Sequence, residues 1–368
     1  MKRGLVLEGG GLRGLFTAGV LDVFMEHGVK FNGIIGVSAG ACFGCNYKSG
    51  QVGRVIRYNK RFARDPRYCS WSSLFKTGDL FNADFCYREL PMELDVFDAA
   101  TYAANPMEFH VVATDCATGK PAYKRLDKAD ARAFEWIRAS ASMPVVSRPV
   151  SIDGCEYLDG GLSDGIPLRY FESLGYDFNV VITTRPHGYR KFPSWKHRLA
   201  KPFLRRYPAV YKALKTRHEW YNETLSYIDS RVADGAAILI APDTPLDISR
   251  VCHDPDRMQA VYEVGRKKAQ ENIERMMSLP STDSASKKAS SSARTPLFCG
   301  YAVALSSGCQ VKAVMLRQRT DVGCPSNVER TSTPSETAVI EGARMNVIVV
   351  SGIPSHLPIV VKLPSCRP

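Results

Sequence analysis

The chain has 368 residues, of which 45% are hydrophobic and 23% charged, and this globular composition excludes disorder throughout and collagen-like repetition. Glycine, proline or charge interrupts every apolar run well before the ~20 residues that a membrane span requires. The formal net charge of +12 favours an anionic partner, either nucleic acid or a phospholipid surface. Eleven cysteines, an odd number, and no secretory leader after Met1 predict reduced thiols in a cytoplasm.

Short apolar runs alternate with amphipathic stretches as far as Pro280. The pattern predicts strands at 4–7, 33–35, 109–113, 180–183 and 237–240, and helices at 12–27, 130–142 and 255–277. Apolar strands separated by helices are typical of a mostly parallel sheet that is covered on both faces. We therefore expect one domain over residues 1–280 with an α/β fold, a three-layer α/β/α sandwich.

The composition changes after this domain. Residues 284–292 contain five serines, and residues 284–368 carry 10 Lys/Arg against 4 Asp/Glu. No helical period follows, and the β-prone segment 345–361 has no turn residues that link it to the body of the chain. We interpret 281–368 as a Ser/Thr-rich basic tail, for which poor order is favoured over a small appended fold.

The first motif with chemical meaning is a glycine-rich turn between the first strand and the first helix. Such a turn directs several backbone N–H groups and the positive end of a helix dipole toward one point, where a phosphate or a developing oxyanion can bind. It also fits the dinucleotide-binding pattern, but that fold requires an acidic residue at the end of the second strand, which here ends in Gly36-Val37-Ser38. A dinucleotide-binding oxidoreductase is therefore the weaker alternative. The residues of the turn are Gly9, Gly10, Gly11, Leu12, Arg13 and Gly14.

The second motif, Gly36-Val37-Ser38-Ala39-Gly40, again lies between a strand and the start of a helix. The two glycines remove side chains where a serine is held on a strained turn, which exposes its hydroxyl above the sheet. The pentapeptide is weak evidence by itself, but its strand–turn–helix setting predicts a nucleophile elbow with Ser38 as the nucleophile.

The third motif is Asp159-Gly160-Gly161, which follows a short extended run at 156–158. Asp-Gly-Gly alone is usually a turn. A carboxylate at a strand end can nevertheless lie within hydrogen-bond reach of a serine and act as its base. Beside the two preceding motifs, Asp159 is the candidate base for Ser38.

In these three motifs, in their order and in their spacing, the sequence resembles the patatin-like phospholipases, and specifically their bacterial members. Residues 139–144, Ala-Ser-Ala-Ser-Met-Pro, are similar to a family feature as well. The resemblance covers about residues 1–280. It implies a Ser–Asp dyad without histidine, in which the amides of Gly10 and Gly11 form the oxyanion hole and Arg13 supports the loop.

One alternative to the dyad is a triad that includes a histidine. A free Asp with a pKa near ~3.9 is a poor base for a serine hydroxyl, so burial must raise the pKa of Asp159 or the oxyanion hole must supply most of the stabilisation. His187 and His253 follow Asp159 in the chain order of α/β-hydrolases, but neither lies in a recognisable motif.

Residues 178–218 contain 11 Lys/Arg and no Asp or Glu, with aromatic residues interleaved. Lys and Arg attract lipid headgroups while Trp and Tyr favour the water–lipid boundary, so 185–217 is predicted to contact an anionic membrane peripherally. A solvated helical face is the plainer interpretation. No nucleic-acid-binding motif is present.

Together these features predict a lipid acyl hydrolase of the phospholipase A or lysophospholipase type, which cleaves carboxylic esters through an acyl-serine intermediate. The chemistry requires no metal and no organic cofactor. A lipid-binding module without turnover is a further alternative, disfavoured by the presence of both Ser38 and Asp159. We expect a cytoplasmic enzyme in peripheral contact with the inner face of the membrane.

Overall fold

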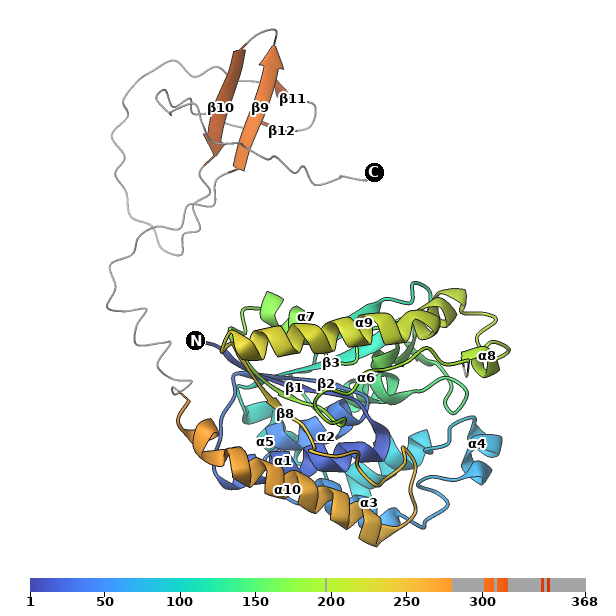
Figure 1. Ribbon diagram of the computed structural model, residues 1–368. Helices are drawn as coiled ribbons and strands as arrows, with labels where there is room; N and C mark the ends of the chain where they lie inside the picture. The colour runs from blue at the N-terminus through green and yellow to red at the C-terminus, as the bar shows by residue number, and fades with distance from the viewer. Residues whose placement is uncertain (196, 280–300, 308–309, 317–338, 341–342, 345–368) are drawn as a thin grey trace. The chain divides into compact units, whose positions relative to one another are not determined.

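The computed structural model describes residues 1–195 and 197–279, together with the four strands 301–307, 310–316, 339–340 and 343–344 (Figure 1). The chain divides into two compact units, Met1–Ser290 and Ser291–Pro368. In the second unit, β9 (Tyr301–Ser307) pairs antiparallel with β10 (Gln310–Leu316), and β11 (Val339–Ile340) pairs with β12 (Ala343–Arg344). The predictions for 281–300 and for 345–361 lie outside the described residues.

The first unit is built on an eight-stranded sheet in the order β5-β6-β3-β2-β1-β7-β8, with β4 paired to β3. The five strands from β3 to β8 in this order run parallel, whereas β4, β5 and β6 are joined antiparallel. The bounds are β1 Arg3–Leu7, β2 Gly33–Val37, β3 Glu108–Asp115, β4 Pro121–Arg125, β5 Val150–Ile152, β6 Cys155–Asp159, β7 Phe178–Ile182 and β8 Ala237–Ile240.

Helices cover both faces of this sheet, with α7 and α9 on one side and α1, α2 and α10 on the other (Figure 1). Every residue of β1 and β2 is buried, as expected for central parallel strands covered on both faces. The bounds are α1 Leu15–Glu26, α2 Ala39–Lys48, α3 Arg54–Phe62, α4 Trp71–Thr77, α5 Ala99–Ala104, α6 Ala131–Ala141, α7 Leu168–Ser173, α8 His197–Ala200, α9 Pro208–Ala233 and α10 Pro255–Met277, with a π-helix at Phe85–Leu94 and 3₁₀ turns at Gly11–Gly14 and Gly160–Leu162.

Helices α1 and α10 join the beginning of the first unit to its end. The buried carboxylate of Asp22 accepts a hydrogen bond from Tyr262 at 2.8 Å, and Arg266 forms an ion pair with Glu26 at 2.8 Å. Met276, in the last turn of α10, is almost fully buried. Contacts of the first unit therefore extend to the last turn of α10.

The predicted fold class is confirmed, and all five predicted strands and three predicted helices are present. The helix predicted at 12–27 begins instead with a 3₁₀ turn, and its α-helical part starts at Leu15. The antiparallel strands β4 and β5 and the helix α9 were not predicted, because their residues lack a regular apolar period. Among the described residues, no helix is long and apolar enough to cross a membrane.

Candidate active site

Ser38 stands on the sharp turn between β2 and α2. Its backbone has φ 54° and ψ −122°, a left-handed conformation that is rare and strained for a residue with a side chain. A Cβ on Gly36 would lie 2.5 Å from the carbonyl oxygen of Gly40, and one on Gly40 would lie 2.5 Å from that of Leu7. Both flanking positions therefore require glycine, and the half-buried Ser38 has the geometry of a nucleophile elbow.

The last turn of α6 and the residue that follows the helix hold Ser38 and Asp159 in place. The hydroxyl of Ser140 accepts a hydrogen bond from the Ser38 N–H at 2.9 Å. The carbonyl of Ser142 accepts one from the Asp159 N–H at 2.8 Å. Two residues of the Ala-Ser-Ala-Ser-Met-Pro segment thus fix the backbones of both candidate catalytic residues, a role that the sequence alone did not reveal.

Asp159 ends β6 and is almost fully buried, at 2% exposure. Its Oδ1 accepts a hydrogen bond from the Gly161 N–H at 2.8 Å, while Oδ2 makes no well-formed hydrogen bond with a described residue. Burial raises the pKa of this carboxyl, and the nearby Ser38 hydroxyl and the charge of Arg217 act in the opposite direction. One oxygen is thus held by the Gly161 amide, while the other remains without a well-formed hydrogen bond near Ser38.

The glycine-rich turn packs directly against the elbow. A Cβ on Gly9 would lie 2.9 Å from the Cβ of Ser38. Among the described residues, none accepts a hydrogen bond from the amides of Gly10 and Gly11. Arg13 is buried in the 3₁₀ turn, where burial and neighbouring arginines lower its pKa to about 10. Because no described residue accepts from the amides of Gly10 and Gly11, both amides are free to donate to a ligand in the cavity.

These residues line one cavity of about 460 Å³. Ser38, Asp159 and Gly161 lie in its wall together with the glycine turn, Gly9 through Arg13. Gly14, Gly36, Gly40 and Gly160 lie behind the wall, where they allow the close packing of the elements. Much of the remaining lining is apolar and comes from residues 42–146, which include Phe43, Leu80, Phe81, Leu90, Phe97, Phe134, Ile137 and Met143.

Neither of the two candidate triad histidines lines this cavity. His187 is exposed, pairs with Asp229 at 3.0 Å and lies in the connection between β7 and α8. His253 hydrogen-bonds the carbonyl of Ala63 at 2.8 Å. Within the described part of the chain, no histidine lines the cavity, and no group of three or more His, Cys, Asp and Glu could hold a metal ion.

Several cavity residues were not predicted to belong to the site. They are Glu8, Tyr221 and the cations Arg185, Lys191, Arg217 and Arg250. Arg185, Lys191 and Arg217 belong to the basic stretch that the sequence assigned as a whole to a membrane-facing surface. The sequence carries only a weak signal that distinguishes these three residues from the surface residues of the stretch, because long-range contacts decide which side chains turn inward.

Two family models match the chain. Residues 5–172 match the model described as patatin-like phospholipase, and residues 207–279 match a domain of unknown function, DUF6363. Both matches lie inside the predicted domain of residues 1–280.

Curated relatives are similar over about half of the chain. An uncharacterized protein of Escherichia coli (strain K12), YjjU, is 34% identical over 54% of this chain and 56% of its own length. An uncharacterized NTE family protein of Mycobacterium tuberculosis (strain ATCC 25618 / H37Rv) is 26% identical over 49% of this chain and 48% of its own. Lysophospholipase nte1 of Aspergillus fumigatus is 28% identical over 47% of this chain but only 11% of its own length.

Among solved structures, VipD from Legionella pneumophila matches with a TM-score of 0.36 and 14% identity, over 75% of this chain and 67% of that one. The match to the family model covers the elbow, the glycine turn and the Asp-Gly-Gly motif. Over residues 5–172, the chain therefore matches the patatin-like phospholipase family.

Proposed function

We propose that the protein is a lipid acyl hydrolase that cleaves carboxylic esters through an acyl-serine intermediate. The observation that carries the proposal is the meeting of Ser38, the buried carboxyl of Asp159 and the free amides of Gly10 and Gly11 in one cavity. Nucleophile, base and oxyanion donors are the parts that acyl transfer requires. Residues 5–172 match a family described as phospholipases, which supports the same chemistry.

In the proposed reaction, Asp159 takes the proton of Ser38 as the serine oxygen attacks the ester carbonyl. The carbonyl oxygen becomes an oxyanion that the amides of Gly10 and Gly11 stabilise. Collapse of this intermediate releases the alcohol, which takes up the proton from Asp159. Water then attacks the acyl-enzyme with Asp159 again as the base, which frees the fatty acid and restores Ser38.

The apolar lining of the cavity supports a lipid as the substrate. An acyl chain that leaves a membrane or micelle loses its apolar environment, and the cavity can replace it with the side chains of Phe43, Phe81, Leu90 and Phe134. The fungal relatives named lysophospholipase agree with this substrate class. A phospholipid or a lysophospholipid is therefore the proposed substrate.

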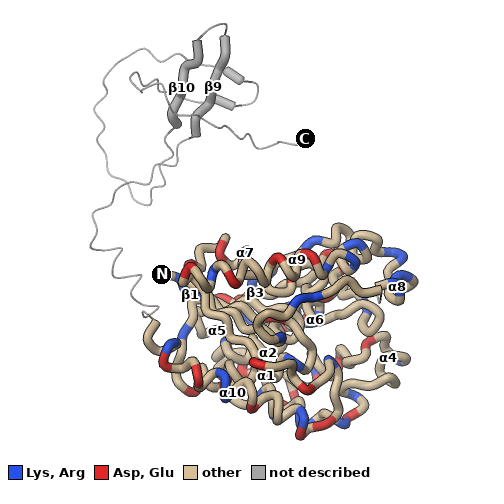
Figure 2. Tube along the Cα trace, in the orientation of Figure 1, with Lys and Arg blue, Asp and Glu red and all other residues tan. Residues whose placement is uncertain are grey.

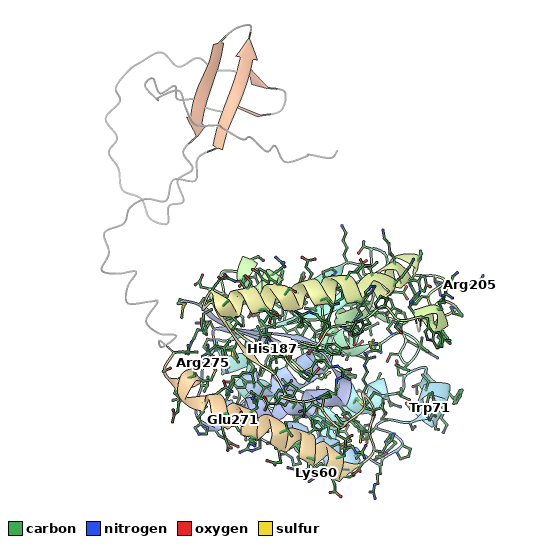
Figure 3. The ribbon with its side chains drawn as sticks, in the orientation of Figure 1. Lys60, Trp71, His187, Arg205, Glu271 and Arg275 are labelled. Carbon is green, nitrogen blue, oxygen red and sulfur yellow. The ribbon has the colours of Figure 1, made fainter. Side chains whose placement is uncertain are left out.

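The basic stretch supports peripheral contact with an anionic membrane. Lys and Arg gather over α8 and the adjoining end of α9 in Figure 2, and Phe192, Trp195 and Phe203 are exposed beside them. Trp71 on α4 is also exposed, and Figure 3 shows it at the same end of the first unit as Arg205. Cations and aromatic side chains on one surface suit an anionic headgroup layer, so we propose that the enzyme works at the cytoplasmic face of a membrane.

A fluorophosphonate probe tests the hydrolase proposal, because it reacts only with an activated serine. Peptide mapping after labelling should find the adduct on Ser38, and Ser38→Ala should remove it. Ser49→Ala serves as the matched control, because its buried hydroxyl donates to the carbonyl of Asn46, the residue does not line the cavity, and its loss should leave labelling intact. A folded protein without an adduct on Ser38 would contradict the proposal.

A further inference from the structure

Seven Lys and Arg side chains line the cavity, and they fall into two groups. Arg54 pairs with Asp95 at 3.2 Å, and Arg138 pairs with Glu135 at 2.5 Å. Among the described residues, no carboxylate forms an ion pair with any of the other five. These five are Arg13, Arg185, Lys191, Arg217 and Arg250.

Lys191 is held in place by its backbone. Its N–H donates to Oδ1 of Asn222 on α9 at 2.7 Å, and Nδ2 of Asn222 donates to its carbonyl at 2.8 Å. Its Nζ lies 3.4 Å from the centre of the Tyr221 ring, whose hydroxyl donates to Glu8 at 2.5 Å. The ammonium group is thus fixed over an aromatic face, and its hydrogen-bonding capacity remains available to a ligand.

Arg217 reaches the cavity beside the candidate base. A Cβ on Gly161 would lie 3.0 Å from its Nη2 and 3.0 Å from Oδ1 of Asp159, so a side chain at this position would crowd both groups. The Nε groups of Arg217 and of Arg13 are buried without an acceptor among the described residues. Buried donors of this kind are normally paired, which indicates that an anion completes their hydrogen bonding.

The five cations also act on one another. Burial, together with Arg217, Arg250 and Arg185, lowers the pKa of Lys191 to about 6, while Glu8 opposes this effect. Arg185 and Arg250 likewise lower the pKa of Arg13. An anion placed between these side chains would relieve their mutual repulsion and favour the charged form of Lys191.

We propose that Lys191, Arg217 and Arg250 bind the phosphodiester anion of the ester that Ser38 attacks, so that the enzyme selects anionic glycerophospholipids over neutral glycerides. This inference rests on the proposed function and adds to it the residues that recognise the phosphate of the headgroup. The apolar residues of 42–146 would take the acyl chain, and the cations of 185–250 the headgroup. Arg217 and Arg250 lie within 207–279, the family region of unknown function, which thereby receives the role of headgroup recognition.

Binding to the full chain carrying Ser38→Ala tests the inference without turnover. Calorimetry would compare decanoyl lysophosphatidylglycerol, decanoylglycerol and inorganic phosphate. We expect the anionic lipid to bind at least tenfold more tightly than either of the other ligands. Adding Lys191→Gln should remove most of this preference. Adding Lys201→Gln, an exposed cation of the same stretch that does not line the cavity, should preserve it.

Equal affinity for the two lipids would overturn the inference. A preference for the anionic lipid that survives both Lys191→Gln and a second variant, Arg217→Gln, in folded protein would overturn it as well. Phosphate that binds as tightly as the anionic lipid would identify a site for the free ion and overturn it as well. The proposed function fails separately, when Ser38 takes no fluorophosphonate label although the anionic lipid binds.

Discussion

The hydroxyl of Ser140 accepts a hydrogen bond from the backbone N–H of Ser38 at 2.9 Å, across 102 residues of sequence. Ser140 is fully buried on α6, and Ser38 has a backbone conformation that needs outside support. The contact supplies this support, because it ties the backbone N–H of Ser38 to a buried side chain of another element. Ser140 is thus a positioning residue for the proposed nucleophile.

Replacing Ser140 with Ala should destabilise the fold by about 1–3 kcal/mol, because the Ser38 N–H is left buried without an acceptor. It should also lower kcat on a p-nitrophenyl ester without a comparable change in KM, since the elbow loosens while the pocket remains. Urea denaturation and steady-state rates measure the two effects. Ser49→Ala removes a buried hydroxyl that donates to the carbonyl of Asn46 and does not line the cavity, and it should retain kcat.

Two local features of the site, the glycine turn and the elbow at Ser38, could be predicted from the sequence. A glycine cluster or a Gly-x-Ser-x-Gly motif between an apolar strand and a helix constrains the backbone locally, and short-range patterns suffice to recognise it. In a parallel sheet the carboxyl ends of neighbouring strands lie at one edge, and β1 and β2 are neighbours here. Gly9 follows β1 and Ser38 follows β2, so the two residues are expected to lie close together at this edge.

The contacts between distant segments could not be predicted. Helix α9 has only three fully buried residues, Val210, Tyr221 and Ile228, in 26 residues, so its apolar period is weak. Whether Lys191 turns inward depends on Asn222, which lies 31 residues away. The sequence therefore indicated a basic stretch but not its division between the surface and the cavity.

Ser38→Ala and Asp159→Asn should each lower the esterase rate by several orders of magnitude, because nucleophile and base act as one unit.

Asp159→Asn should be at least as stable as the parent at pH 7. Burial raises the pKa of Asp159, so the folded state binds the proton more tightly than the unfolded chain, and at high pH the buried charge costs stability. Rates on a short-chain p-nitrophenyl ester and thermal unfolding measure both effects.

Substitution of His187 or His253 by Gln provides the matched control for the dyad. Each rate should stay within about tenfold of the parent, since tenfold is only ~1.4 kcal/mol and can arise from packing. A folded histidine variant as inactive as Ser38→Ala would restore the triad.

A chain that ends at Pro280 should fold and keep its esterase activity. The proposed site lies wholly within residues 8–251, and α10 ends at Met277. A chain that ends at Asp254 should not fold, because it loses α10 and with it the Asp22–Tyr262 and Glu26–Arg266 contacts. Circular dichroism and rate measurements on the two chains decide the matter. Precipitation of the chain that ends at Pro280 would mean that the tail belongs to the domain.

Binding to vesicles should require anionic lipid and weaken as salt rises, because each Lys or Arg near the surface contributes about 1 kcal/mol within a Debye length. Replacing Phe192 and Trp195 with Ser should weaken binding further, since both side chains are exposed, Phe192 by 79%. Co-sedimentation with neutral and anionic vesicles measures this. Replacing the exposed Val264 on α10, away from the basic stretch, is the control. Equal binding to both vesicle types would disprove the docking surface.

The pH dependence of kcat/KM on a neutral ester should report the ionisation of Asp159. Activity requires the carboxylate, so the rate falls as the pH drops through the pKa of Asp159, which burial raises above its usual range. Arg217 lowers this pKa through its charge. Arg217→Gln should therefore raise the pKa and move the acid limb of the profile to higher pH.

Lys215→Gln is the control for this shift. Lys215 is an exposed cation on the same helix, α9, and it does not line the cavity, so its loss should leave the acid limb in place. An acid limb in the ordinary carboxyl range near ~4 in the parent enzyme would argue against a buried base. A limb that does not move in folded Arg217→Gln would mean that this charge does not act on the catalytic carboxylate.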